Sequence, residues 1–292
     1  MTHTKVVLIP APMFVGAGLK GTDRFPQALV DAGLSDHLGA EQAAGPGPMT
    51  WSRDFDAIAE QPPLDAIRDY LLRLADDVEW TLQAGAMPMV MGGDCTVLLG
   101  AGVACKRNGI DGLLFVDGHT DFWPLGDPDW ETASCDLALA TGHGPKQLSH
   151  LAGEPSFECA NVVALGFRDR SDEGEHGKSI VATDILRLPL SKIRSRGFGN
   201  AVKMALNRVA KHGRRFWLHL DVDVFDDAVL PAVDYRMPGG LSAGEVAAII
   251  RRANETRALA GMTVSILNPD LDHEGSQVAL VAGVLGTALR PT

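Results

Sequence analysis

The feature that most constrains this chain is the alternation of continuous apolar runs with segments of helical periodicity. The apolar runs cover residues 5–12, 87–94, 112–119, 161–169, 216–225 and 261–269. Runs without apolar–polar alternation are typical of strands covered on both faces. Helical patterns lie between the runs, at residues 63–85, 96–108, 200–213, 242–256 and 276–289. This order predicts an α/β fold, specifically a three-layer α/β/α sandwich with a mainly parallel sheet.

The composition suits a soluble protein with a large core, because 46% of the 292 residues are hydrophobic and 22% are charged. We find no linker, internal repeat or low-complexity tract, so we expect one domain. Long loops on an α/β sheet usually shape an active site beyond the carboxyl ends of the strands. We expect such loops at residues 39–54, 121–134, 167–179 and 226–240.

The formal net charge of -11 argues against nucleic acid and anionic membranes as partners and favours a small cationic ligand. The N-terminal segment lacks the pattern of a signal peptide, and no apolar run reaches membrane-spanning length. We therefore expect a cytoplasmic protein. The four cysteines show neither C-x-x-C spacing nor the density of a disulfide scaffold, which predicts reduced thiols.

Acidic side chains follow two of the apolar runs where each run ends. Asp117, His119 and Asp121 alternate after "LLFV", and Asp221 and Asp223 alternate after "LHL". Residues at i and i+2 of an extended segment point to the same side. Five such donors at one edge of a parallel sheet suit two divalent cations that generate hydroxide near neutral pH. The alternative for the first segment alone is a polar loop whose aspartates cap helices, and the second pair alone could be structural.

A third strand end carries the segment "GGDC", whose glycines permit a tight turn. Asp94 can cap the helix that starts near Thr96 or hold a metal ligand in place. For Cys95, three interpretations stay open: a nucleophile, a metal ligand or a small buried residue. His219 alternates with Asp221 and either lines the site or packs in the sheet.

The segments "GGDC", "DGHTD" and "DVDVFDD" resemble, in their order and at these strand ends, the metal motifs of the arginase/agmatinase (ureohydrolase) family. The N-terminal "GAGLKGTDRFPQALVDAGL" is similar to that family's glycine-rich opening, which accounts for its G-x-G-x-x-G pattern better than a dinucleotide site does. The segments "MPGGLSAGE" and "LNPDLD" resemble later signatures. The resemblance covers nearly the whole chain and implies one arginase-like metallohydrolase domain at residues 1–292.

The resemblance implies a binuclear centre, with manganese the usual metal, and hydrolysis of an amidine or guanidinium carbon by a hydroxide that bridges the metals. The residues that match metal ligands are Cys95, Asp117, His119, Asp121, Asp221 and Asp223. Asp117 and Asp221 match the bridging positions. Cys95 and Asp121 match ligands of the first metal, and the other two match ligands of the second. Asp121 and Asp223 are also candidate catalytic residues. By analogy we expect a homo-oligomer, a trimer or a hexamer.

Three departures from the family pattern concern the chemistry. Cys95 stands where the family usually has a histidine ligand, and a thiolate there would favour zinc, iron or cobalt over manganese. Ala133 aligns with a histidine that shuttles protons, and Ser134, Cys135 and Asp136 follow it. Ile266, in "SILNP", replaces a glutamate that pairs with the guanidinium.

Our leading hypothesis is a metal-dependent, arginase- or agmatinase-like hydrolase of linear C–N bonds that acts on a small cationic guanidino or amidino compound, with release of urea as one outcome. With Ile266 in the pocket, the substrate could also be a non-guanidino amide. A second hypothesis is a metal-binding pseudoenzyme of the same fold. A third, Cys95 as the nucleophile, requires a neighbouring base that the sequence does not identify.

Overall fold

Eight strands form one sheet in the computed structural model, which describes residues 5–49, 64–122, 131–169 and 180–290. Every strand pair is parallel, and the order across the sheet is β2-β1-β3-β8-β7-β4-β5-β6. The strands are β1 (Val6–Ala11), β2 (Glu41–Gln42), β3 (Met87–Gly92), β4 (Gly112–Val116), β5 (Val162–Leu165), β6 (Leu186–Leu188), β7 (Phe216–Asp221) and β8 (Leu259–Ser265).

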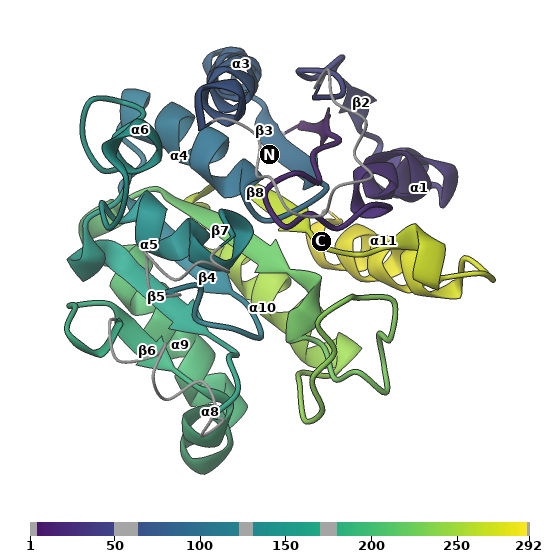
Figure 1. Cartoon of the computed structure of the whole chain (residues 1–292). Coiled ribbons are helices and arrows are strands. Elements are labelled where there is room, and N and C mark those ends of the chain that lie inside the picture. The colour runs from purple at the N-terminus through teal and green to yellow at the C-terminus, as the bar shows by residue number, and fades with distance from the viewer. Residues whose placement is uncertain (1–4, 50–63, 123–130, 170–179, 291–292) are drawn as a thin grey trace.

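Helices cover both faces of this sheet (Figure 1). One apolar cluster joins alternate strand residues, such as Leu113, to the helices α3 (Leu64–Gln83), α4 (Val97–Arg107), α5 (Asp136–Ala140) and α6 (Lys146–Ser149). The other joins the intervening strand residues, such as Leu114, to α1 (Phe25–Asp31), α2 (Leu34–Leu38), α8 (Leu190–Arg196), α9 (Phe198–Val209), α10 (Ala243–Glu255) and α11 (Ser276–Leu289). Because the strands are apolar on both faces, they fit only between two helix layers.

The three-layer sandwich expected from the sequence is confirmed, and all six expected strands and five expected helices are present. The pattern missed β2 and β6, which lie at the two edges of the sheet and are too short to show periodicity. Parts of three expected loops, residues 50–54, 123–130 and 170–179, lie outside the described residues, as do residues 1–4, 63 and 291–292. Among the described helices, none is both long enough and apolar enough to cross a membrane.

Four neighbouring strands in the middle of the sheet, β3, β8, β7 and β4, bring the chemically interesting segments together. In a parallel sheet, the carboxyl ends of all strands meet at the same edge. The segments that leave these ends begin with Gly93, Ile266, Val222 and Asp117. The order of the strands, rather than closeness in sequence, therefore sets which polar residues meet.

Candidate metal centre

The turn between β3 and α4 is fixed by close contacts with the N-terminal segment. Asp94 is buried, and its Oδ2 accepts a hydrogen bond from the Gly16 N–H at 2.7 Å. Its Oδ1 accepts a hydrogen bond from the Thr96 N–H at 3.0 Å. A Cβ at Gly93 would overlap the carbonyl oxygen of Met13, so only glycine fits. The glycine-rich opening thus packs on this turn, and the turn presents the next residue, Cys95, to β7.

The segment after β4 forms one group of metal-binding atoms together with the end of β7. His119 Nδ1 lies 2.7 Å from Asp223 Oδ2, and the His119 N–H donates to Asp117 Oδ1 at 2.5 Å. The Gly118 N–H donates to the other Asp223 oxygen at 3.0 Å. One ligand atom from each of Asp117, His119 and Asp223 lies within 4.8 Å of the others. We call these three residues the outer group.

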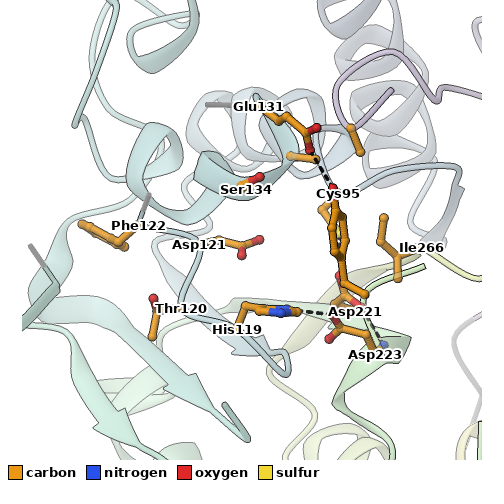
Figure 2. A pocket seen from close by; sticks show the side chains of 13 residues that line it. Cys95, His119, Thr120, Asp121, Phe122, Glu131, Ser134, Asp221, Asp223 and Ile266 are labelled. Atoms are coloured by element: carbon orange, nitrogen blue, oxygen red, sulfur yellow. Dashed lines mark hydrogen bonds and ion pairs between the residues drawn. The ribbon is translucent and has the colours of Figure 1, made fainter. Parts of the chain in front are cut away.

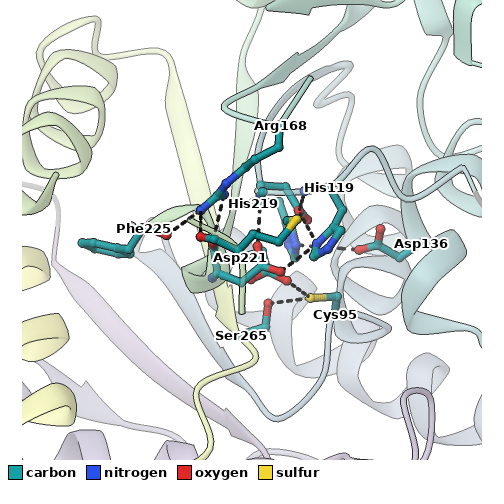
Figure 3. Close-up of polar contacts among 12 residues, drawn as sticks. Cys95, His119, Asp136, Arg168, His219, Asp221, Phe225 and Ser265 are labelled. Carbon is teal, nitrogen blue, oxygen red and sulfur yellow. Dashed lines mark hydrogen bonds and ion pairs between the residues drawn. The ribbon is translucent and has the colours of Figure 1, made fainter. Parts of the chain in front are cut away.

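Cys95 lies against the last residue of β7. Its Sγ donates to Asp221 Oδ2 at 2.7 Å and is 3.2 Å from Ser265 Oγ, at the end of β8 (Figure 3). The other Asp221 oxygen accepts a hydrogen bond from the Asp223 N–H at 2.7 Å. Asp221 therefore links Cys95 to the outer group.

A second group combines Cys95 with two residues that the ligand prediction did not include. One ligand atom from each of Cys95, Asp136 and His219 lies within 4.8 Å of the others, and all three residues are buried. Asp136 is the first residue of α5, and His219 lies inside β7. We call this set the inner group. The sequence did not decide whether His219 lines the site or packs in the sheet, and in the structure it is a sheet residue that joins the inner group. Asp136 was named only as a residue that follows Ala133, without a ligand role.

A pocket of about 390 Å³ is lined by residues of both groups. Figure 2 shows the side chains that line it. Its lining residues are Ala17, Cys95, His119, Thr120, Asp121, Phe122, Glu131, Ala133, Ser134, Asp221, Asp223, Tyr235 and Ile266. Five of the six residues predicted as metal ligands thus line one pocket. The sixth, Asp117, is buried beside His119 and Asp223.

Two residues of the pocket wall have backbone conformations that L-residues rarely adopt. Asp121 has φ 45°, and Ile266 has φ 79°. A positive φ is a genuine outlier for a β-branched residue such as isoleucine. The Ile266 N–H donates to the Gly93 carbonyl at 2.7 Å, which holds the strained residue against the β3 turn. Such strain is concentrated at functional sites.

The buried carboxylates make this region short of positive charge. Burial raises the pKa of Asp117, and the neighbouring carboxylates Asp121 and Asp223 raise it further. Burial also raises the pKa of Asp221, Asp121 and Asp136, and again nearby carboxylates add to the shift. A cation among these groups would remove both penalties.

Burial and contacts with charged neighbours shift the pKa values of His119, Asp223 and Cys95 in different directions. Burial opposes charge on both His119 and Asp223, but their contact raises the pKa of His119 to about 10 and lowers that of Asp223. Burial, followed by the charge of Asp221, raises the pKa of the Cys95 thiol. A nucleophilic cysteine needs the opposite shift, so these surroundings argue against Cys95 as the nucleophile.

The Arginase family model matches residues 4–289. The chain belongs to the arginase family. The arginase of Brevibacillus brevis is 28% identical over 294 residues, which cover 97% of this chain and 98% of that protein. The structure of Bacillus caldovelox arginase matches with a TM-score of 0.87 and 21% identity over 99% of both chains. Trypanosoma cruzi formiminoglutamase with Mn²⁺ matches with a TM-score of 0.72 and 23% identity, over 99% of this chain and 95% of that one.

Membership of the arginase family places the chain among hydrolases, and its buried donors fit a divalent metal centre. Within the described part of the chain, Asp117 Oδ2, both Asp136 oxygens and His219 Nε2 are buried without a hydrogen-bond partner. Buried polar atoms normally have partners, and hard oxygen and imidazole donors are ligands of divalent metals. The departures at Cys95, Ala133 and Ile266 all face the pocket of this arginase-family chain.

Two further residues of this arginase-family site were not singled out from the sequence. Arg168 is buried and donates to the carbonyls of Asp223 at 3.0 Å, Phe225 at 2.6 Å and Met237 at 3.0 Å, so it shapes the loop after β7. Glu131 lies in the pocket wall and accepts a hydrogen bond from Tyr235 Oη at 3.4 Å. Burial raises the pKa of Glu131 to about 7.

Proposed function

We propose that this protein is a metal-dependent hydrolase of linear C–N bonds in a small amidino or guanidino compound. The observation that carries the proposal is that the outer group, Asp121, Asp221 and Cys95 meet at the carboxyl edge of the sheet, where all of them except Asp117 line one pocket. Buried carboxylates in such number are costly without a cation. The proposed ligands are the six residues predicted from the sequence, with Asp121 and Asp223 also catalytic.

Two divalent ions, when bound, would supply hydroxide near neutral pH and stabilise the tetrahedral species formed when it adds to the planar carbon of the substrate. The chain's own groups hold and orient that centre. Asp223 fixes the imidazole of His119 through its Nδ1, and Gly118 N–H fixes the Asp223 carboxylate in turn. Manganese is the proposed metal, with zinc, iron or cobalt as alternatives at the position beside Cys95.

The residues that line the pocket favour a cationic substrate other than arginine. Ile266, an apolar residue, lines the wall where the family resemblance expects a glutamate. Glu131 and Tyr235 supply a carboxylate and a hydroxyl elsewhere in the same wall. We propose that a guanidinium or amidinium group pairs with Glu131, because this carboxylate lies outside the proposed ligand set. A non-guanidino amide is the alternative that Ile266 favours.

The test is a screen of the metal-loaded protein for urea or ammonia release over a panel of guanidino, amidino and formimino compounds. We expect turnover of at least one member, and none by Asp223→Asn, which serves as the matched inactive variant. Metal bound in full with no turnover across the panel would contradict the proposal. It would favour the alternative of a metal-binding pseudoenzyme or a non-guanidino substrate.

The proposal extends to the whole protein. We propose a cytoplasmic homo-oligomer, a trimer or a hexamer by analogy with the family, in which residues 1–292 act as one catalytic domain. The single sheet that runs through the described residues supports one domain. Analytical ultracentrifugation of the metal-loaded protein measures the oligomeric state, and a monomer at micromolar concentration would contradict the oligomer.

A further inference from the structure

We infer that the inner group, Cys95, Asp136 and His219, forms a thiolate metal site beneath the pocket floor that selects zinc or a similar thiophilic ion over manganese. Two of its members, Asp136 and His219, lie outside the ligand set taken from the family resemblance. The inference deepens the metal centre of the proposed function and rests on that centre, but it does not depend on turnover.

The spacing inside the inner group fits an ion better than a hydrogen bond. His219 Nε2 lies 3.7 Å from Asp136 Oδ2, too far for a hydrogen bond between them. A histidine nitrogen and a carboxylate oxygen bound to the same tetrahedral zinc ion are roughly 3.3–3.5 Å apart at typical bond lengths, so the two atoms need to approach by only a few tenths of an ångström. Within the described residues, neither this nitrogen nor either Asp136 oxygen has a partner at hydrogen-bonding geometry, although both side chains are fully buried. The neighbouring carboxyl group of Asp121 also interacts with Asp136, but it adds negative charge and no cation. An ion between them would satisfy all three atoms.

The imidazole of His219 is oriented as a metal ligand requires. Binding through Nε2 requires the proton on Nδ1, and Thr263 Oγ1 lies 2.6 Å from Nδ1 as its acceptor. Phe115 stacks on the ring with centroids 4.9 Å apart and an interplanar angle of 15°, which fixes its plane. A hydrogen bond to the second ring nitrogen is the usual support of a ligating histidine.

Charge and burial indicate what kind of ion the inner group takes. A Cys95 thiolate and an Asp136 carboxylate together neutralise one divalent ion, and the imidazole adds no charge. A thiolate ligand favours zinc over manganese. Asp136 and His219 are not part of the pocket wall, whereas His119 and Asp223 of the outer group are. The inner ion is therefore the enclosed one, and the outer group faces the substrate.

Asp221 connects the two positions. Its Oδ2 is 2.7 Å from the Cys95 sulfur, and its Oδ1 is bonded to the backbone of Asp223 in the outer group. Asp221 thus borders both groups and can complete the inner site or bridge to the outer one. The result is a centre with two unlike positions, one with sulfur and one with oxygen and nitrogen only.

The test compares metal binding and spectra of the full-length protein and single variants. After removal of bound metal, the protein is loaded with Co²⁺, and thiolate-to-cobalt charge transfer is recorded in the near ultraviolet. We expect this band in the wild type, in His119→Asn, which alters only the outer group, and in Cys159→Ser, the matched cysteine control. We expect Cys95→Ser to lose it. Asp136→Asn and His219→Gln should weaken the inner ion's affinity by more than about tenfold.

Unchanged inner-ion affinity in both Asp136→Asn and His219→Gln would overturn the inference. Should these buried variants fail to fold, X-ray absorption of the wild type with zinc decides. One sulfur at about 2.3 Å and nitrogen or oxygen at about 2.0 Å are expected, and a shell without sulfur would overturn the inference. Turnover without the thiolate band contradicts this inference and the ligand role of Cys95 but not the proposed hydrolysis, whereas the band without turnover contradicts only the proposed hydrolysis.

Discussion

The ionisation of Glu131 should make substrate affinity depend on pH. Burial raises the pKa of its carboxyl to about 7, and Tyr235 donates a hydrogen bond to it. The carboxylate is mostly protonated at pH 6 and mostly ionised at pH 8, so affinity for a cationic substrate should rise with pH across this range. We expect the KM of such a substrate to fall roughly fivefold, the equivalent of about 1 kcal/mol for a partly exposed ion pair.

Steady-state kinetics between pH 6 and 8 measure this dependence, with Glu131→Gln as the control. The variant should have a higher KM and lose the pH-dependent fall, while its kcat at saturation stays close to that of the wild type. A KM profile identical in both proteins would exclude Glu131 from contact with the substrate.

The predicted ligands Asp117 and Asp223 allow a direct test of the outer group. Asparagine keeps the shape of each side chain but removes its charge, and both residues are buried beside His119. We expect each substitution to lower metal affinity by more than about 100-fold, beyond the loss typical of outer-sphere partners. Isothermal titration with Mn²⁺ measures it. Asp111→Asn, at an exposed site before β4, is the control, and wild-type affinity in the two ligand variants would remove them from the centre.

At the scale of elements, the β3–α4 turn depends on the absence of a side chain at Gly93. A methyl group there would overlap the Met13 carbonyl, so Gly93→Ala must displace the N-terminal segment or the turn that carries Cys95. We expect a loss of roughly 1–3 kcal/mol in unfolding free energy, together with weaker binding at the inner group.

Urea denaturation and metal titration check this expectation against Gly283→Ala. Gly283 lies inside α11 with open space around its Cβ position, so alanine there should be neutral or stabilising by up to about 1 kcal/mol. Equal stability of the two variants would contradict the role assigned to the turn.

The strands and their ends could be predicted from the sequence, whereas residues placed by tertiary packing could not. Strand ends were recognisable because apolar runs stop abruptly at polar residues, as at Asp117 and Asp221, and the parallel order makes those ends meet. A ligand role for Asp136 was not recognisable, because this residue begins a five-residue helix whose position depends on tertiary packing. Arg168 was missed for a similar reason, since its partners are backbone carbonyls far along the chain. The ligand roles themselves stay predictions.

In the whole molecule, the fold is that of the arginase family, and the three residues that the sequence predicted as departures from the family pattern lie in the pocket wall. The core positions that form the sheet and both helix layers follow from hydrophobic pattern alone, as the strands around Leu113 and Leu114 illustrate. The chemistry of the pocket wall depends on individual residues, among them Cys95, Ala133 and Ile266. A fold can host many functions, so the substrate must be argued from this wall and not from the family.

The metal content of the purified protein tests the proposed binuclear centre without recourse to activity. Protein purified without chelators should be analysed for all divalent metals by mass spectrometry, with protein concentration from amino-acid analysis. We predict about two divalent ions per chain, one of them zinc or another thiophilic ion. Protein that retains no divalent ion after incubation with both Mn²⁺ and Zn²⁺ and dialysis would exclude a metal centre at this site.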